Sequence, residues 1–513
     1  MMKEQIPPIL RPEAVAPVSL ATIREQFDLE LISGDLETLV SGISMNTNDL
    51  RVGDLFVAMP GVKTHGAKFI QKALDAGAAA VISDTAGIAE LGSLEIPVMK
   101  LEHPRKRLGA LASFVYGNLP GQMPKVFGTT GTNGKTSTTY ILEAMLRQLG
   151  EVTGLTSTAE RHIAGEVIVS RLTTPESTEM QALIARMRER KVSSVAIEVS
   201  AQALSQLRVD GIEFDVVGFT NLSHDHLDDY ADMAEYLAAK VALFQPDRAH
   251  RGVVSLDSQY GEAFLNGAGI PCVTVSIDAS KPADYMVRVT TELPGRTEFE
   301  VTTPAGRVIS SSLPIIGAHM ASNAGLAIAM LVQAGFAEER IAEALAGGVD
   351  CYLPGRTELV SPAGAPSVYV DFGHSPDAFL NTLAAVRKVT QGKVLMLFGA
   401  DGDRDATKRP AMAKEAVLGS DILVITDHHP RFEDPDSIRA TLVAAARAAK
   451  PQAEIYEVSP PEAAIVKAVS LVGPGDSILW AGPGHQDYRD IRGVRTPYSA
   501  RALARQALKD AGW

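Results

Sequence analysis

The sequence is poor in cysteine and in long apolar runs. It has two cysteines among 513 residues, Cys272 and Cys351, which excludes a disulfide framework and a cysteine-based metal site and is typical of a reducing compartment. No apolar run approaches the ~20 residues that a helix needs to cross a membrane. The Pro-rich start, residues 1–17, has no signal-peptide core. We therefore expect a cytoplasmic protein without membrane insertion.

Positive charge is also scarce. The chain has 61 acidic residues against 48 Lys and Arg, a net charge of −13. A general nucleic-acid binder usually carries a basic face, so we expect no nucleic-acid partner. Apolar residues make up 46% of the chain, which is enough for sizeable cores. At ~150 residues per domain, the length predicts roughly three domains.

One stretch, residues 126–137, has a clear chemical pattern. A short apolar run leads into a Gly/Thr loop, and Lys135-Thr136 opens an amphipathic run that ends near residue 150. A strand, a small-residue loop and a helix start form a phosphate cradle, because backbone N–H groups and the helix dipole favour anions. Lys135 would reach the terminal phosphates and the Thr136 hydroxyl would bind Mg²⁺. The pattern is not strict, since Thr129 stands where the first glycine is expected. A Gly-rich turn alone would not explain Gly-Lys-Thr.

Alternating strand and helix patterns predict an α/β protein with three domains. We expect an N-terminal α/β domain at 1–122, a central P-loop domain with a mostly parallel sheet at 123–350, and a Rossmann-like domain at 351–513. Residues 1–20 resemble a loose arm, residues 117–122 a Pro/Gly linker, and residues 278–314 a β-rich region. The expected strands are 55–59, 79–82, 195–197, 216–219, 368–370, 394–398, 422–425 and 478–480, and the expected helices are 67–76, 104–116 and 315–335.

Polar clusters follow most of these strands. In open parallel sheets, ligands bind beyond the carboxyl ends of the strands, so we expect these clusters to contribute to a site. Glu198 follows a strand after the phosphate loop, which is a usual position for a Mg²⁺ ligand. Lys240 cannot bind Mg²⁺ as an ammonium, and the residues alone leave its role open. Each side chain by itself has an ordinary explanation as a cap, a loop or a solvated lysine. The combination favours a function. The clusters are 198–200, 220–226, 371–377, 399–405, 427–431 and 482–487.

Several stretches together resemble the Mur ligase family, in the branch that adds the third amino acid to the peptidoglycan precursor. They run in family order from about residue 43 to the C-terminus. The phosphate loop alone would also fit a folylpolyglutamate-type ligase, but the other motifs favour the Mur branch. A non-catalytic nucleotide-binding relative would carry substitutions at Lys135, Glu198 or Lys240, and none is seen. The similar stretches are 130–136, 173–176, 198–200, 206–211, 219–227, 238–240, 354–356, 371–377 and 402–405.

The resemblance implies roles for these motifs in an ATP-dependent ligase that forms an amide through an acyl phosphate, expected to be a monomer. The catalytic residues would be Lys135, Glu198, His226 and Lys240. ATP would be held by Gly131, Thr132, Asn133, Gly134, Lys135, Thr136, Ser137, Asn323, Arg356, Asp371 and His374. UDP-MurNAc-L-Ala-D-Glu would contact Thr47, residues 62–64, Thr173, Thr174, Ser200, Gln206 and Arg208, and the N-terminal domain would bind its UDP-MurNAc part. Mg²⁺ would be bound by Thr136, Glu198, His226 and Lys240, the last carbamylated by CO₂ into an anionic ligand.

The third amino acid would bind to the C-terminal domain, where the chain departs from the family pattern. Asp-Asn-Pro-Arg, which recognises meso-diaminopimelate in the family, is His428-His429-Pro430-Arg431 here. The family stretch Gly-Lys-Gly-His-Glu begins at Gly482 and ends in neutral Gln486, which weakens an ion pair to a hydrogen bond.

We therefore expect a diamino acid, L-lysine in the first place, with ornithine or meso-diaminopimelate as alternatives. Arg404 would hold its α-carboxylate. Metal binding by His428 and His429 is an alternative, although adjacent histidines on a loop are more often surface residues. In the N-terminal domain, the family's Asp-Ser-Arg is replaced by Asn46-Thr47-Asn48, which alters the expected uridine site.

Overall fold

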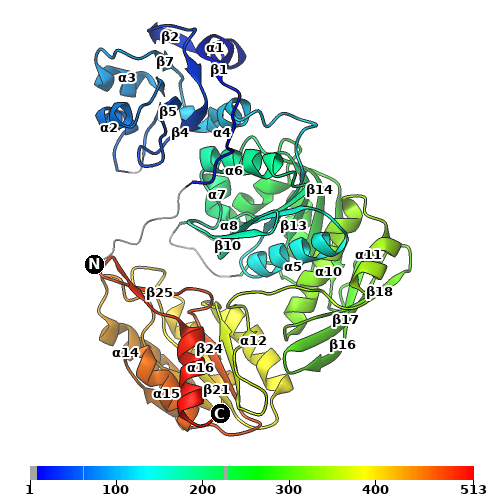
Figure 1. Cartoon of the computed structure of the whole chain (residues 1–513). Coiled ribbons are helices and arrows are strands. Elements are labelled where there is room, and N and C mark those ends of the chain that lie inside the picture. The colour runs from blue at the N-terminus through cyan, green and yellow to red at the C-terminus, as the bar shows by residue number, and fades with distance from the viewer. Residues whose placement is uncertain (1–8, 62, 224–228) are drawn as a thin grey trace. The chain divides into compact units, whose positions relative to one another are not determined.

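The computed structural model describes residues 9–61, 63–223 and 229–513, and it contains three α/β domains, each with its own sheet (Figure 1). His226 and residue 62 lie outside the described residues. The chain divides into two compact units, one of residues 1–128, 150–217 and 242–250, the other of residues 129–149, 218–241 and 251–513. The predicted fold class is confirmed, whereas the boundaries at 122 and 350 stay predictions. Across the described ranges, no helix is long and apolar enough to cross a membrane.

The N-terminal domain contains a five-stranded sheet in the order β2-β7-β6-β5-β4, parallel except for β2. β5 and β6 are buried on both faces, as their continuous apolar runs predict. The strands are β1 (Val18–Ser19), β2 (Glu30–Ser33), β3 (Leu39–Val40), β4 (Gly42–Ser44), β5 (Asp54–Ala58), β6 (Ala80–Ser83) and β7 (Val98–Lys100). The helices are α1 (Leu20–Phe27), α2 (Ile70–Asp75), α3 (Thr85–Leu91) and α4 (Pro104–Val115), with a 3₁₀ turn at Gly66–Phe69. The helix expected at 67–76 therefore begins as a 3₁₀ turn.

The segment before α1 is not a loose arm. Arg11 is buried, and its Nη1 lies 2.8 and 2.7 Å from the two carboxylate oxygens of Asp54. Its Nη2 donates to the carbonyl oxygen of Asp49 at 2.9 Å. A buried guanidinium with matched acceptors ties this segment to the start of β5, so the expectation of a free arm is wrong for residues 9–20.

The stretch 117–122 is a connection that the chain holds in place. Arg188 donates to the Gly117 carbonyl at 2.6 Å and to Gln122 Oε1 at 3.1 Å. The buried Asn118 donates to both the backbone and the side-chain oxygen of Gln181 at 2.8 Å. The Pro/Gly composition predicted a linker, but these bonds make it an ordered junction.

The central sheet has eleven strands in the order β11-β10-β9-β12-β8-β13-β14-β15-β16-β17-β18. The last three strands form antiparallel pairs, which confirms the β-rich region expected at 278–314. The strands are β8 (Lys125–Thr130), β9 (Thr153–Thr156), β10 (Glu160–Ile163), β11 (Glu166–Val169), β12 (Ser194–Glu198), β13 (Phe214–Phe219), β14 (Ala249–Ser255), β15 (Cys272–Ser276), β16 (Tyr285–Leu293), β17 (Arg296–Thr302) and β18 (Val308–Leu313). The helices are α5 (Lys135–Gln148), α6 (Ser177–Glu189), α7 (Ala201–Ser205), α8 (Met233–Val241), α9 (Gly261–Gly267), α10 (Ala318–Gln333) and α11 (Glu338–Leu345).

The C-terminal domain has a six-stranded sheet in the order β19-β20-β24-β21-β22-β23, in which all neighbours except β19 are parallel. Its strands are β19 (Glu358–Leu359), β20 (Ser367–Asp371), β21 (Val394–Phe398), β22 (Ile422–Ile425), β23 (Glu454–Glu457) and β24 (Ser477–Ala481), followed by the hairpin β25 (Tyr488–Ile491) and β26 (Val494–Pro497). Its helices are α12 (Pro376–Val389), α13 (Arg409–Gly419), α14 (Pro435–Ala449), α15 (Pro461–Ser470) and α16 (Ala500–Asp510).

Side chains of this sheet alternate between two apolar layers. Met396 and Phe398 of β21 pack with α12, α13 and α14, whereas Leu395 and Leu397 pack with α15 and α16. Both faces are covered, so the strands read as continuous apolar runs, as the sequence predicts for parallel strands. The polar loops follow the strand ends and lie at the edge of the sheet, outside these two apolar layers.

Candidate functional site

The predicted phosphate loop lies between β8 and α5, and two glycines shape it. Gly131 has φ +149° and Gly134 has φ +85°, a region that favours glycine. A Cβ at Gly131 would lie 1.9 Å from Thr220 Oγ1, and one at Gly134 would lie 2.8 Å from Asn323 Oδ1. Only glycine therefore allows the loop to approach these two side chains. The loop brings Asn323, predicted from the resemblance, next to the start of α5.

Two lysines meet at one carbonyl oxygen of this loop. Lys135 Nζ donates to the carbonyl oxygens of Gly131 and Thr132 at 3.0 and 2.8 Å. Lys240, on α8 and 1% exposed, donates to the same Gly131 oxygen at 2.8 Å. Its ammonium also lies 4.4 Å from the ring centre of Tyr236, a cation–π distance. The structure thus places the ammonium of Lys240 at the phosphate loop.

Residues before β19 and after β20 contact the same loop and helix. Arg356 Nη2 donates to Thr136 Oγ1 at 3.1 Å, and its guanidinium lies 4.4 Å from the Phe372 ring centre. Asp377 Oδ2 accepts from Asn133 Nδ2 at 3.1 Å.

Asp371 orders the loop around it. Its Oδ2 accepts from the Thr357 backbone N–H at 2.7 Å, and its Oδ1 accepts from the Gly373 N–H at 2.6 Å. His374 lies beside this turn, with Nδ1 2.9 Å from the Phe372 carbonyl oxygen. The predicted ATP residues of the C-terminal domain therefore lie close together in the chain segments around Arg356 and Phe372. Among them, Asp371 accepts hydrogen bonds from backbone N–H groups.

Glu198 lies at the end of β12 in the other compact unit and is 2% exposed. Thr158 binds its carboxylate twice, through the backbone N–H at 2.8 Å and the hydroxyl at 3.0 Å. The same hydroxyl lies 3.0 Å from Thr173 Oγ1. These two donors fix the orientation of the Glu198 carboxylate. Thr158 was not predicted from the sequence.

The predicted dipeptide residues form a connected group in the same unit. Thr174 Oγ1 donates to the Glu198 carbonyl at 2.8 Å and accepts from the Ser200 N–H at 3.1 Å. Arg208 donates to Gln206 Oε1 at 2.7 Å.

An acidic residue holds the arginines of this group. Glu176 pairs with Arg208 at 2.9 Å and with Arg105 at 2.8 Å. Arg105 extends from the N-terminal domain and was missed by the sequence analysis, since an arginine at a helix start carries no motif.

Thr47 is half-buried in the N-terminal domain, and its side chain has no recorded contact with this group in the described residues. Its neighbours are connected, however. Asn46 donates to Asp49 Oδ2 at 2.7 Å, and Asp49 Oδ1 pairs with Arg171 at 3.1 Å, two residues before Thr173. Arg171 is another site candidate that the sequence did not reveal.

The altered amino-acid motif forms a buried polar cluster in the C-terminal domain. Asp401 Oδ1 lies 2.6 Å from His428 Nδ1, and Asp401 Oδ2 lies 3.4 Å from Arg431 Nη2. Burial alone would raise the pKa of Asp401, but His428, His429 and Arg431 outweigh it and hold that pKa well below its usual range. Asp401 is therefore ionised and accepts hydrogen bonds only.

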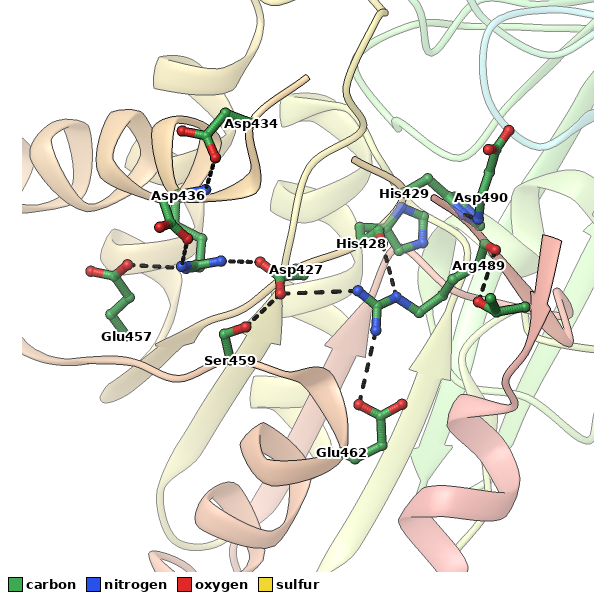
Figure 2. Close-up of polar contacts among 12 residues, drawn as sticks. Asp427, His428, His429, Asp434, Asp436, Glu457, Ser459, Glu462, Arg489 and Asp490 are labelled. Carbon is green, nitrogen blue, oxygen red and sulfur yellow. Dashed lines mark hydrogen bonds and ion pairs between the residues drawn. The ribbon is translucent and has the colours of Figure 1, made fainter. Parts of the chain in front are cut away.

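His429 connects this cluster to Gln486 and to β25. Its Nδ1 accepts from the Asp490 backbone N–H at 2.9 Å, and its Nε2 lies 2.7 Å from Gln486 Oε1 (Figure 2 shows His429 beside Asp490). Burial and the neighbouring His428 lower the pKa of His429 to about 4, so the ring is neutral near pH 7. A backbone N–H can only donate, so the single ring proton is on Nε2 and is donated to Gln486.

His428 and His429 are not surface residues, so that expectation is wrong: they are 9% and 3% exposed. Together with Asp401 they could supply three metal ligands. His429 Nδ1 already accepts a hydrogen bond and Nε2 carries the proton, so this ring has no lone pair to offer. Without His429, the three-ligand set is reduced to His428 and Asp401, which is too few protein ligands for a structural metal site.

The remaining predicted residues differ in how closely their neighbours pack against them. Gly482, with φ +113°, faces His428, since a Cβ on it would lie 3.6 Å from His428 Nε2. Gly402 allows a close approach, because a Cβ there would lie 2.0 Å from the Pro430 carbonyl oxygen. Arg404 is exposed, and no contact of its side chain is recorded in the described residues.

Comparison with known protein families gives three matches along the chain. The model described as "Mur ligase family, catalytic domain" matches residues 39–116, "Mur ligase middle domain" matches 129–331, and "Mur ligase, glutamate ligase domain" matches 355–484. The matches fall on the three domains in order.

Individual relatives extend over the whole chain. The UDP-N-acetylmuramyl-tripeptide synthetase of Leifsonia xyli is 51% identical over 510 residues, covering 99% of both chains. The UDP-N-acetylmuramoyl-L-alanyl-D-glutamate–2,6-diaminopimelate ligase of Streptomyces avermitilis is 40% identical over 97% of this chain and 98% of its own. A solved structure with the same ligase name has a TM-score of 0.67 at 24% identity, covering 97% of this chain and 100% of its own, which shows the fold.

Proposed function

The chain belongs to the Mur ligase family, and we propose that it adds the third amino acid to UDP-MurNAc-L-Ala-D-Glu during peptidoglycan precursor synthesis. The observation that carries this proposal is the full-length similarity to a relative named as a tripeptide synthetase. Because this similarity includes the N-terminal domain, it favours the Mur branch over a folylpolyglutamate-type ligase. Members of the family are ATP-dependent ligases, and we propose a cytoplasmic monomer.

The proposed reaction has two steps. The γ-carboxylate of D-Glu attacks the γ-phosphorus of ATP, which releases ADP and gives an acyl phosphate. The amine of the third amino acid then attacks the acyl carbon, forming the amide and releasing phosphate. Lys135 would stabilise the charge on the transferred phosphoryl group, because phosphate oxygens can replace the two neutral carbonyl oxygens that now bind its ammonium. The loop N–H groups and the α5 N-terminus would hold the remaining phosphates.

The side chains proposed for Mg²⁺ fit that ion, since they are oxygen donors. Glu198 supplies a buried carboxylate oriented by Thr158, and Thr136 supplies a hydroxyl. Bound Mg²⁺ would neutralise charge on the phosphates. We propose that carbamylated Lys240 adds a further oxygen ligand and that His226, which lies outside the described residues, is its neighbour.

A rescue experiment tests the carbamate. Lys240→Ala is expected to lose at least 100-fold in the rate of phosphate release, and short carboxylates such as formate or acetate are expected to restore part of it. Arg190→Ala, an exposed change at the end of α6, serves as the control that needs no rescue. A Lys240→Ala enzyme that stays fully active without added carboxylate would refute the carbamate role.

For the third amino acid we propose a diamino acid, with L-lysine first and ornithine or meso-diaminopimelate as alternatives. The support is that Asp401 already pairs with Arg431, so no distal carboxylate of the substrate is needed there. The test incubates the protein with ATP, Mg²⁺, UDP-MurNAc-L-Ala-D-Glu and each amino acid, and follows phosphate release. No release with any of them contradicts the proposed function, and release with meso-diaminopimelate alone contradicts the lysine preference. Release with pteroylglutamate and glutamate would favour the folylpolyglutamate alternative.

A further inference from the structure

The loop after β14 contains a carboxylate that joins three elements of the central domain. Asp257 Oδ1 accepts from the Ser276 hydroxyl at 2.7 Å and from the Ile277 backbone N–H at 3.0 Å, at the end of β15 and just after it. Its Oδ2 accepts from the Ser322 hydroxyl on α10 at 2.8 Å. A carboxylate that accepts three such bonds on both oxygens has little freedom to turn. Asp257 therefore fixes α10 against the ends of β14 and β15.

The bond from Ser322 connects this loop to the phosphate loop. A serine hydroxyl inside a helix can turn back to the carbonyl oxygen four residues earlier, but Ser322 donates out of α10 to Asp257. The next residue is Asn323, whose Oδ1 faces Gly134, since a Cβ on that glycine would lie 2.8 Å from it. α10 also packs along α5, which begins directly after Gly134 (Figure 1). The Asp257–Ser322 bond thus sets the position of α10 where Asn323 meets the phosphate loop.

Ser258, the next residue of the same loop, holds a second segment that contacts the phosphate loop. Its hydroxyl oxygen accepts from the Leu222 backbone N–H at 3.2 Å and lies 3.3 Å from the Leu222 carbonyl oxygen. The neighbouring Asn221 binds the backbone of Asn133 in both directions: Oδ1 accepts from its N–H at 2.9 Å, and Nδ2 donates to its carbonyl oxygen at 3.1 Å. Asp257 and Ser258 therefore reach the phosphate loop by two routes, one through α10 and one through Asn221.

We propose that Asp257 and Ser258 are positioning residues for ATP, which act through Asn323 and Asn221 and do not contact the nucleotide themselves. This inference rests on the proposed function, in which the phosphate loop binds ATP. Backbone N–H groups and a helix N-terminus bind phosphate only when they point at it, so a displaced loop misaligns several donors at once. No motif marks these two residues, because their partners lie 65 and 36 residues away in the sequence.

Variants that remove single bonds test the proposal by calorimetric titration with a non-hydrolysable ATP analogue and Mg²⁺. Ser322→Ala removes one hydroxyl and raises the helix propensity of its position, so α10 stays formed; its Kd is expected to rise about fivefold. Asp257→Ala, which removes all three bonds, should raise Kd about tenfold or more, and Ser258→Ala about threefold. The matched control is Ser311→Ala, which removes a 2.8 Å bond from β18 to the Leu345 carbonyl and should leave Kd unchanged.

A conservative variant separates positioning from a direct role of the charge. In Asp257→Asn the amide oxygen can accept from Ser276 and Ile277, and the amide N–H can donate to the Ser322 hydroxyl, which also accepts. This variant should therefore bind the analogue within about twofold of the wild type. Adding Ser322→Ala to Asp257→Ala should cost nothing more, because both remove the same bond. In each variant KM for ATP should rise with Kd, while KM for UDP-MurNAc-L-Ala-D-Glu stays the same.

Outcomes of this experiment separate the two proposals. If the wild-type protein does not bind the analogue, the proposed function fails and this inference fails with it. If the wild type is an active ligase but Ser322→Ala and Ser258→Ala bind the analogue as it does, only the inference is wrong. A loss in Asp257→Asn as large as in Asp257→Ala, with Ser322→Ala unchanged, would also overturn it, because the carboxylate would then contact the nucleotide or its metal ion directly. If Asp257→Ala does not fold, Ser322→Ala gives the answer.

Discussion

Gly131 accommodates the closest approach in the phosphate loop. A Cβ there would lie 1.9 Å from Thr220 Oγ1, and the φ of +149° is unfavourable for other residues. We predict that Gly131→Ala loses at least tenfold in affinity for an ATP analogue. The measurement is the increase in Tm on adding the analogue. Gly165→Ala, which also has a positive φ but open space around it, is the control for strain alone and should keep the increase.

His429 makes stability sensitive to acid. The pKa of His429 in the folded chain is about 4, below the ordinary value of about 6.5. Between these two pH values the unfolded chain therefore binds a proton at His429 and the folded chain does not. The stability contributed by the neutral ring is therefore full above pH 6.5 and is lost as the pH falls toward 4. We predict that His429→Asn shows a smaller drop in Tm between pH 7.5 and 4.5 than the wild type. Equal drops would contradict this, and His250→Asn, at an exposed site, should behave like the wild type.

Individual site residues could be predicted where a local pattern carries them. Lys135 and Thr136 follow from Gly-Lys-Thr at a strand-to-helix junction, and the structure has that junction at β8 and α5. The burial of His428 could not be predicted, because it depends on Arg489 and the hairpin some sixty residues later. Thr158 and Arg105 carry no motif, since their partners Glu198 and Glu176 are distant in sequence.

The hairpin β25–β26 positions His429 through the Asp490 N–H, and its turn is strained. Arg492 and Gly493 have φ values of +53° and +77°, as in a two-residue type I′ turn, which favours Asn-Gly. We predict that Arg492→Asn raises stability by about 0.5 kcal/mol or more, because asparagine tolerates this conformation better than arginine. Thermal unfolding measures the gain. A lower Tm would mean that the Arg492 side chain makes contacts worth more than the strain.

Elements buried on both faces could be predicted, and exposed ones could not. The runs at 394–398 and 422–425 correspond to β21 and β22, since continuous apolar residues mark parallel strands under helices on both sides. β23 lies at a sheet edge and shows no such run, whereas β11 carries the short apolar run 167–169 although it is mostly exposed. The 3₁₀ start of the helix expected at 67–76 depends on His65, whose Nδ1 accepts from the Ala67 N–H at 3.0 Å.

At the scale of the whole chain, the connection at 117–122 behaves as part of a packed unit. Helices α4 and α6 pack together across it, and Ala182 and Ala185 of α6 belong to the apolar core of the N-terminal domain. We predict that limited proteolysis of the wild type does not start at 117–122, whereas Arg188→Ala, which removes the bonds to Gly117 and Gln122, makes this stretch the first site cut.

Mass spectrometry of the early fragments reads out this difference. Arg190→Ala, on the same helix end but exposed, is the matched control and should digest like the wild type. Early cutting of the wild type at 117–122 would contradict the prediction. The number of domains could be predicted from the length and from the repeated α/β pattern. The packing of α4 on α6 across residues 117–122 could not, because a Pro/Gly-rich composition is the same in a free linker and in one that side chains hold in place.

The one-way hydrogen-bond chain from Asp490 through His429 to Gln486 has a consequence for how this part of the C-terminal domain can evolve. A Gln codon becomes a Glu codon by one nucleotide change, and the resulting carboxylate would still accept the His429 proton. It would also favour a protonated His429 imidazole, so a single mutation would alter the charge at position 486 and at His429. The Asp490 backbone N–H opposes this protonation, because it donates to the ring nitrogen that would take the proton. This hydrogen-bonded chain is therefore one mutation from a different charge, and His429 sets the cost of that step.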